Sequence, residues 1–149
     1  WGGFLEEKIK KYELSDKIGL IPFGSRGDVE KLISTADCLI VLGVENTNYG
    51  VIPSKMFDYI AAEKPILAYG LEEEAKSIIE DLNLGKNFRF DDVTNSANYI
   101  LKLFQEKKEG QKNEIDSSKK DKYSRRYQTG QLADVFNLAS NTRSTSGKL

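Results

Sequence analysis

The sequence of 149 residues contains no histidine and only one cysteine, Cys38. The absence of histidine excludes Ser-His-Asp and Cys-His catalysis, together with metal sites that use imidazole ligands. A single cysteine cannot form a disulfide within the chain, which fits a reducing compartment. Chemistry must therefore come from carboxylates, lysine, arginine, hydroxyl groups, backbone amides or helix termini.

The sequence also lacks a long apolar run, since none approaches the roughly 20 residues that span a bilayer. Its net charge is only −1, so neither nucleic acid nor a membrane is expected as the main partner. The chain opens on a charged, helix-like stretch, without the pattern of a signal peptide. A composition of 39% hydrophobic and 30% charged residues suits an ordinary α/β domain with one core.

Hydrophobic spacing predicts strands that alternate with helices. This order is typical of a Rossmann-like parallel sheet with helices on both faces. Such sheets bind ligands at the carboxyl ends of their strands, which points to the loops after Phe23, Gly43 and Tyr69. The predicted strands are 18–23, 37–43, 65–69 and 87–90. The predicted helices include 4–14, 53–63 and 93–104. A capping box at Ser25 and Asp28 opens a further predicted helix, and another starts at the acidic residues 72–74.

The predicted organisation is one Rossmann-like domain over 1–106, followed by a polar linker over 107–122. The linker is rich in Lys, Glu, Ser and Asn; its lysines are expected to be solvated, with weak peripheral membrane contact as the alternative. Helical spacing returns over 123–138, which is expected to be a closing helix. The polar end, 139–149, is expected to be a flexible tail.

The most informative stretch runs from Pro53 to Pro65. As a helix it places Ser54, Lys55 and Asp58 on one face, while its apolar residues face the sheet. The N–H groups of its first turn form an anion site that Lys55 would reinforce. A diphosphate bound there would leave Asp58, one turn on, in position to accept hydrogen bonds from a ribose diol.

The run PSKMFDYIAAEKPILAYG resembles the signature of retaining GT-B glycosyltransferases (glycosyltransferase group 1, family 4-like) that make bacterial polysaccharides. The upstream run IPFGSRGDVEKLISTADCLIVLG and the helix from Tyr123 match in the same order, so the resemblance covers most of residues 1–138. It implies the C-terminal, donor-binding half of a hexosyltransferase-type enzyme. Such an enzyme moves a sugar from a nucleotide-diphosphate donor to a glycan or lipid-linked acceptor in cell-surface polysaccharide synthesis. It also implies no bound metal or other cofactor, and a cytoplasmic protein at the inner face of the membrane.

The resemblance assigns roles to particular residues. Asp58 would bind the ribose, and Ser54 and Lys55 would face the diphosphate, with Lys55 as the catalytic residue that stabilises the leaving group. The other predicted donor contacts border the sugar or the base: Gly50, Val51 and Ile52 beside the sugar, and Phe23, Gly24 and Ser25 beside the base.

Three positions depart from the family pattern. Many relatives carry an acid where this chain has Gly50, a glycine where it has Glu63, and glutamate where it has Asp58. The first departure leaves open a second interpretation, a non-catalytic nucleotide-sugar-binding or interaction module of the same fold. An unrelated doubly wound domain is a third, although no paired acids stand at the end of the first strand as a receiver-like protein needs.

The resemblance also implies that part of the domain is missing. In the family, residues 1–3 would end the second strand, so the first strand, which lies in the middle of the sheet, would lie upstream. The acceptor-binding N-terminal domain would lie further upstream. We therefore expect an N-terminally incomplete domain that is inactive on its own.

Overall fold

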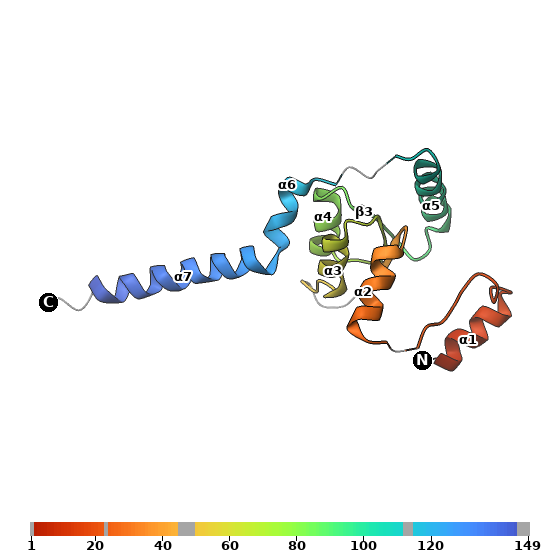
Figure 1. The fold of residues 1–149 in the computed structure, drawn as a ribbon, viewed down its shortest axis with the longest axis horizontal. Coiled ribbons are helices and arrows are strands. Elements are labelled where there is room, and N and C mark those ends of the chain that lie inside the picture. The colour runs from red at the N-terminus through yellow and green to blue at the C-terminus, as the bar shows by residue number, and fades with distance from the viewer. Residues whose placement is uncertain (1, 23, 45–49, 112–114, 146–149) are drawn as a thin grey trace. The chain divides into compact units, whose positions relative to one another are not determined.

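The computed structural model describes residues 2–22, 24–44, 50–111 and 115–145. They fall into two compact units, divided after Ser34, and each unit is considered by itself. The larger unit contains a three-stranded parallel sheet in the order β1-β2-β3 (Figure 1). Its strands are β1 (Leu39–Leu42), β2 (Ile66–Tyr69) and β3 (Gly85–Phe88).

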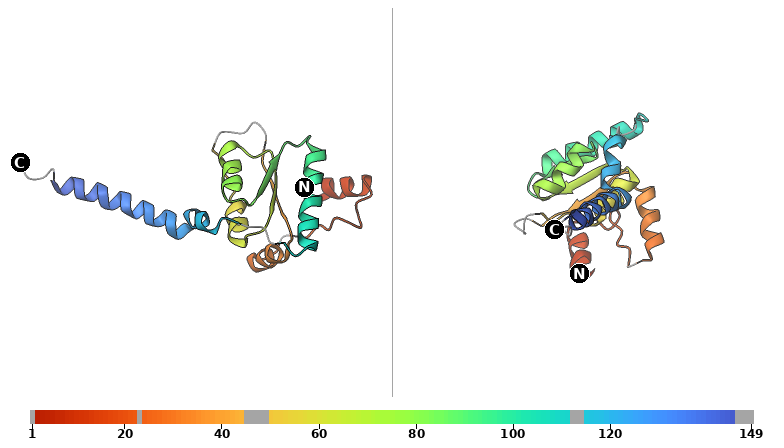
Figure 2. Two further views of the ribbon diagram at one scale, coloured as in Figure 1. Left: turned by 90° about the horizontal axis from the view of Figure 1, so that it is seen from above. Right: turned by 90° about the vertical axis from the view of Figure 1, so that its left-hand side faces the viewer.

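Helices cover both faces of this sheet. Helices α3 (Lys55–Ala62) and α4 (Glu73–Asp81) connect the strands and lie on one side, and α5 (Val93–Lys108) lies on the other (Figure 2). On the α5 side, the ring of Tyr99 packs 5.8 Å from that of Phe88, measured between centroids. The predicted Rossmann-like α/β class, with helices on both faces, is therefore confirmed.

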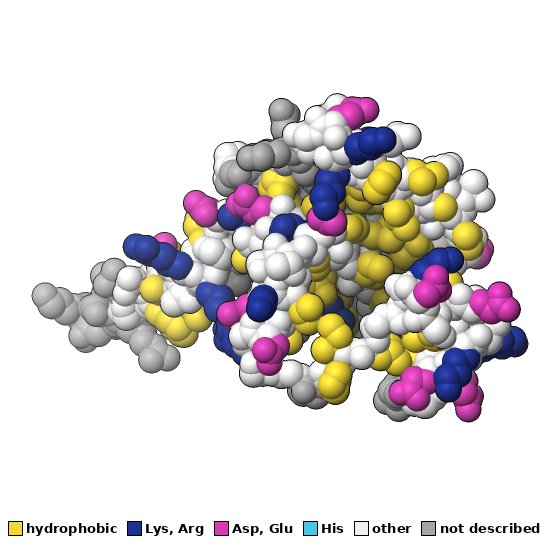
Figure 3. Space-filling view, turned by 45° about the vertical axis from the view of Figure 1, so that its right-hand side comes forward, with side chains coloured by type: hydrophobic (Ala, Val, Ile, Leu, Met, Phe, Trp, Pro, Cys, Tyr) yellow, Lys and Arg dark blue, Asp and Glu magenta, His cyan; other side chains and the backbone are white. Residues whose placement is uncertain are grey.

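Alternation along the strands decides which side chains enter the core. In β1, Leu39 and Val41 are buried, whereas Ile40 and Leu42 on the opposite face are 53% and 57% exposed. Apolar side chains reach the molecular surface in several places (Figure 3). The core beneath α3 and α4 combines strand, helix and loop residues: Val41, Met56, Ile60, Ile66, Ala68, Leu71, Ala75, Ile78, Ile79, Leu82 and Leu84.

Strand β1 forms one edge of the sheet. Its inner side is bonded to β2, with the Gly43 N–H donating to the Tyr69 carbonyl at 2.7 Å. No strand among the described residues pairs with its outer side. The stretch from Leu39 to Val44 also has no charge and no proline, the features that usually protect a sheet edge. The strand expected from the family order stays a prediction.

Most elements of the larger unit lie close to their predicted ranges, although β3 begins at Gly85 rather than at Asn87. The predicted strand at 18–23 is wrong for its described residues, 18–22, which form no strand. Leu20 and Ile21 are 45% and 67% exposed. A parallel strand needs a neighbouring strand to pair with its backbone N–H and carbonyl groups, and residues 2–22 and 24–34 contain no strand.

The first unit contains α1 (Gly2–Lys11) and the start of α2 (Arg26–Thr35). Helix α2 begins at the predicted capping box. The Ser25 N–H donates to Asp28 Oδ2 at 2.9 Å, and the Asp28 N–H donates to Ser25 Oγ at 3.3 Å. The hydrogen bonds from Ser25 lower the pKa of Asp28. Nevertheless, no residue of α2 is buried.

The predicted polar linker at 107–122 is largely structured instead. Helix α5 continues to Lys108, and residues 115–123, called the strap below, include α6 (Ser117–Lys120) and the 3-10 helix η1 (Asp121–Tyr123). Ile115 and Tyr123 pack against the core. Residues 112–114 lie outside the described residues.

Ion pairs hold the strap against the last turns of α3 and α4. Lys119 and Lys122 pair with Asp81 at 3.1 and 2.5 Å, and Lys120 pairs with Glu63. Hydrogen bonds from Lys122 and Lys119 lower the pKa of Asp81. The sequence pattern predicts solvated lysines here and does not predict the strap, because the acidic partners of these lysines lie far away in the sequence.

Helix α7 (Arg125–Thr145) follows the strap and is longer than the predicted 123–138. Ser124 caps it, since its Oγ accepts a hydrogen bond from the Tyr127 N–H at 3.2 Å. Residues 139–145 are therefore helical, and 146–149 lie outside the described residues. None of the described helices has both the length and the hydropathy to cross a membrane.

Candidate functional site

The carboxyl ends of the three parallel strands share one edge of the sheet, and α3 and α4 both begin there. The strand ends are tightly packed. A Cβ atom on Gly43 would lie 2.1 Å from the Gly70 carbonyl oxygen, so only glycine allows this approach. A Cβ atom on Gly70 would lie 2.5 Å from the Phe90 ring. Gly43, Gly70 and Phe90, which follow the three strands, are therefore closely packed against one another at this edge.

The first turn of α3 carries the predicted phosphate contacts. Ser54 precedes the helix in a helical conformation (φ −56, ψ −32), and its side chain makes no capping hydrogen bond. The Met56 N–H donates to the Pro53 carbonyl at 2.9 Å, and the Phe57 N–H donates to the Ser54 carbonyl at 3.2 Å. Two backbone donors are thus used within the turn. Anion binding here would depend on the Ser54 hydroxyl and Lys55 as well as on the backbone.

The predicted division of α3 into two faces is found in part, because the apolar residue Ala61 is exposed. Met56 and Ile60 are buried in the core, whereas Lys55 and Asp58 are exposed. Half-buried Tyr59 follows Asp58; burial and, to a smaller extent, the Asp58 charge raise the pKa of Tyr59. Buried anchors on one face hold the ammonium and the carboxylate toward solvent on the other.

Residues 50–52 lead into α3. Gly50 has a φ of +90°, which favours glycine, and Ile52 packs against the core. A Cβ atom on Gly50 would lie 3.8 Å from Oε2 of Glu74, in the first turn of α4. The spacing of residues 72–74 predicts only a helix start, and no sequence pattern indicates that Glu74 lies beside this segment.

Asn87 of β3 holds the loop after β2. Its Oδ1 accepts a hydrogen bond from the Leu71 N–H at 3.1 Å, and its Nδ2 donates to the Leu71 carbonyl at 3.4 Å. The Gly70 N–H donates to the Phe88 carbonyl at 2.9 Å. Asn87 is not among the site residues predicted from the sequence. The available signal was an amide in the middle of a short strand of a parallel sheet.

An aromatic cluster packs at the same edge, on the α5 side of the sheet. Tyr69 and Phe90 stack with centroids 6.0 Å apart and planes at 17°. Phe88 contacts both Tyr69 and Tyr99. Burial raises the pKa of Tyr99 to about 12. These rings support the ends of β2 and β3.

The three residues predicted to border the base belong to the first unit. Phe23 lies outside the described residues. Gly24 and Ser25 precede α2, and the Ser25 hydroxyl donates to Asp28 Oδ2 at 2.7 Å. Ser25 is therefore used as a helix cap, and its predicted contact with the base stays a prediction.

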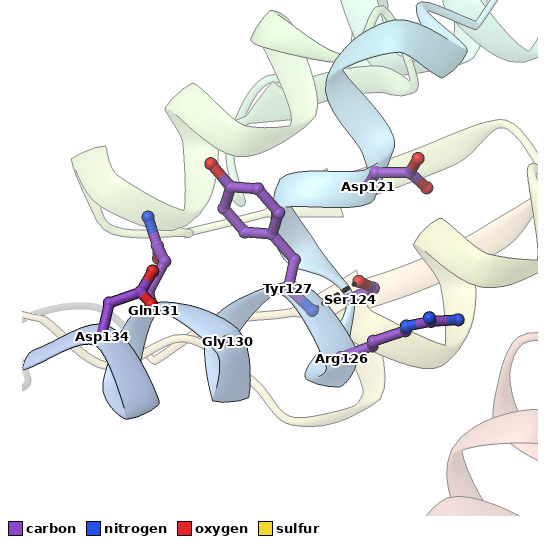
Figure 4. Close-up of a pocket in the computed structure, with 7 residues that line it drawn as sticks. All are labelled: Asp121, Ser124, Arg126, Tyr127, Gly130, Gln131 and Asp134. Atoms are coloured by element: carbon purple, nitrogen blue, oxygen red, sulfur yellow. Dashed lines mark hydrogen bonds between the residues drawn. The ribbon is translucent and has the colours of Figure 1, made fainter. Parts of the chain in front are cut away.

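A hollow of about 750 Å³ lies elsewhere, between η1 and the start of α7 (Figure 4). It contains none of the predicted donor contacts. The adjoining strap contacts Glu63, which follows α3, and Asp81 in the last turn of α4, whereas the predicted phosphate and ribose contacts lie at the first turn of α3. Residues from both elements line the hollow: Asp121, Ser124, Arg126, Tyr127, Gly130, Gln131 and Asp134.

Within the described ranges, no three Cys, Asp or Glu side chains are grouped as ligands of one metal ion.

Comparison with protein families gives a match to the model described as "Glycosyl transferases group 1", over residues 3–121. The matched range is well over half of the 149 residues and includes the sheet, α3, α4 and α5. No curated protein and no solved structure matches the chain significantly.

Proposed function

The chain belongs to the group 1 glycosyltransferases, and on that premise we propose that residues 50–58 bind the nucleotide-diphosphate sugar donor of a glycosyltransferase. The observation that carries this proposal is the first turn of α3. It presents Ser54, Lys55 and Asp58 at the carboxyl edge of the sheet, and buried Met56 and Ile60 fix its orientation.

In this proposal each side chain has a distinct role. Lys55 and the Ser54 hydroxyl contact the diphosphate, and Lys55 offsets the negative charge that develops on the leaving group. Asp58, one turn further along α3, accepts hydrogen bonds from the ribose hydroxyls. Residues 50–52 offer backbone groups to the donor sugar.

The charges at the two helix starts orient the donor. The first turn of α3 contains Lys55 and Asp58, whereas that of α4 contains Glu73, which pairs with Lys76 at 3.3 Å, and Glu74. A diphosphate beside the Glu74 carboxylate would be repelled. The uncharged sugar belongs there instead, because carboxylates accept hydrogen bonds from hydroxyl groups. The donor would thus run from its diphosphate at α3 to its sugar near Gly50 and Glu74.

The finer assignments rest on the signature from Pro53 to Pro65. We propose a retaining hexosyltransferase of cell-surface polysaccharide synthesis, with a glycan or lipid-linked acceptor and no requirement for a bound metal. Its proposed location is the cytoplasm, at the inner face of the membrane. The acceptor site is proposed to belong to a further domain, so residues 1–149 alone would bind donor without turnover.

Calorimetric titration with UDP, GDP, ADP and their sugars tests the proposal. The wild type is expected to bind one nucleotide series, and Asp58→Ala to weaken that binding by about 10- to 100-fold, the usual worth of hydrogen bonds to a charged group. Glu80→Ala, which removes an exposed carboxylate from the last turn of α4, is the matched control. A wild type that binds none of these nucleotides would contradict the proposal.

A second candidate, a non-catalytic nucleotide-sugar-binding module, is favoured by Gly50, which offers no side chain at a position where many relatives have an acid. Donor binding with no turnover by the intact protein, across a panel of glycan and lipid-linked acceptors, would support this candidate over the enzyme.

A further inference from the structure

Asn87 is the residue of β3 with a side-chain amide. Like a backbone peptide group, this amide both donates and accepts a hydrogen bond. It pairs with both the N–H and the carbonyl of Leu71, at 3.1 and 3.4 Å. Leu71 has already left β2, so the side chain continues the pairing of β2 and β3 beyond the end of the strand. The half-buried Asn87 thus fixes the first residue of the loop that leads to α4.

The restrained loop touches the ends of two other segments at the carboxyl edge. Gly70, in the left-handed region at φ +61°, places its carbonyl against Gly43 after β1. Leu71 itself is buried. Helix α4 starts at Glu73, and the Glu74 carboxylate stands beside Gly50. A shift of Leu71 would therefore change the packing at Gly43, which precedes the segment that enters α3, and at Gly50, which lies within that segment.

We propose that Asn87 is a positioning residue for the sugar end of the donor site. The inference rests on the proposed function and adds a residue that the family signature does not contain. Asn87 does not touch the donor; it holds residues 70–74 so that Glu74 and the segment 50–52 keep a fixed separation. The diphosphate end, on the first turn of α3, is anchored separately by Met56 and Ile60. Loss of the Asn87 amide should thus affect the sugar more than the diphosphate.

Three variants of the protein test this inference. Asn87→Leu keeps the approximate size but removes both hydrogen bonds, which leaves the Leu71 backbone groups unpaired. Asn87→Asp keeps an acceptor for the Leu71 N–H, the shorter of the two bonds. Ile79→Val trims a fully buried α4 side chain that makes no bond to the loop, and serves as a control for general loss of stability.

The readout is the ratio of dissociation constants for a nucleotide sugar and for the same nucleoside diphosphate without sugar. Asn87→Leu is expected to weaken binding of the nucleotide sugar about tenfold and that of the diphosphate less than twofold, which a global loss of stability would not produce. Asn87→Asp should fall between Asn87→Leu and the wild type. Ile79→Val should leave the ratio unchanged.

Hydrogen exchange provides a measurement that does not need the ligand. In Asn87→Leu, amide exchange should become faster at Leu71 and at residues 50–52, and in Ile79→Val it should not. An unchanged ratio of dissociation constants, or faster exchange confined to Leu71, would overturn the inference while leaving the proposed function intact. If the wild type binds no nucleotide, the proposed function fails and the role of Asn87 in donor binding fails with it.

Discussion

Two apolar runs of similar composition adopt different structures in this protein. The run from Asp37 to Gly43 contains β1, which buries Leu39 and Val41. The run over residues 18–22 forms no strand, and its side chains are exposed. The runs differ in their neighbours, because β1 pairs with β2 along its length. Apolar composition makes a strand possible, and a paired neighbour makes it form.

Helices α2 and α3 show the same dependence on the residues packed against them. Helix α2 has a complete capping box, yet buries no residue. Helix α3 lacks a side-chain cap, yet buries Met56 and Ile60. Caps therefore mark where a helix begins, while burial depends on what faces its apolar side.

The largest effect should come from cutting into the core of the larger unit. Ile66→Ala in β2 is expected to lower the free energy of unfolding by about 2–5 kcal/mol, the usual range for a buried isoleucine. Leu32→Ala in α2 should cost less than about 0.5 kcal/mol, because this side chain is exposed. Urea unfolding followed by circular dichroism measures both. A costly Leu32→Ala would mean that the first unit is packed in solution, and would break the comparison.

Glycine substitutions should give the next largest contrast. In Gly43→Ala the new Cβ atom meets the Gly70 carbonyl oxygen at 2.1 Å, so the backbone must shift. The expected loss is about 1–3 kcal/mol, as for other overpacked sites. Gly19→Ala in the first unit, where no atom lies within 4 Å of the new Cβ, should stay within about 0.5 kcal/mol. Thermal unfolding of the two variants under identical conditions makes the comparison, and equal losses would count against the close approach of Gly43 and Gly70.

A smaller effect is expected at two glutamates that share a left-handed conformation. Glu13 and Glu63 both have a φ of +54°, and Glu63 also pairs with Lys120 of the strap. Glu63→Gly relieves backbone strain but loses that pair, so its net effect should stay below about 1 kcal/mol. Glu13→Gly only relieves strain.

A double-mutant cycle of Glu63→Gly with Lys120→Ala should show a coupling of about 0.5 kcal/mol. No coupling would mean that the strap does not use this pair.

The smallest expected effects appear on acidification. The pKa values of Asp28 and Asp81 are both lowered, by Ser25 in one unit and by Lys122 and Lys119 in the other. A lowered pKa stabilises the folded state above the ordinary aspartate pKa of about 4, and this contribution is lost as the pH falls through the lowered value.

Asp81→Asn should therefore reduce the change in unfolding free energy between pH 5 and 3, measured by urea titration at each pH. Asp28→Asn should reduce only the acid loss of helical signal in circular dichroism. A pH dependence of unfolding that Asp81→Asn leaves intact would exclude the strap as its source.

Local patterns predicted much of the larger unit. The alternating elements from 37 to 104 could be predicted because each is a continuous run of residues with its own hydrophobic pattern. The exposed face of α3 with Lys55 and Asp58 followed from helical periodicity alone. The strap and the Asn87 pairing could not be predicted in this way. They join Lys120 to Glu63 and Asn87 to Leu71, which lie far apart in sequence and follow no period.

The uncharged outer side of β1 has a consequence for the protein in concentrated solution. Copies in concentrated solution can add to one another strand by strand along such an edge. Colloidal stability would then depend on β1, residues 39–42, more than on the −1 net charge of the whole chain. The substitution Ile40→Lys, on the exposed face of the strand, would slow this polymerisation without entering the core.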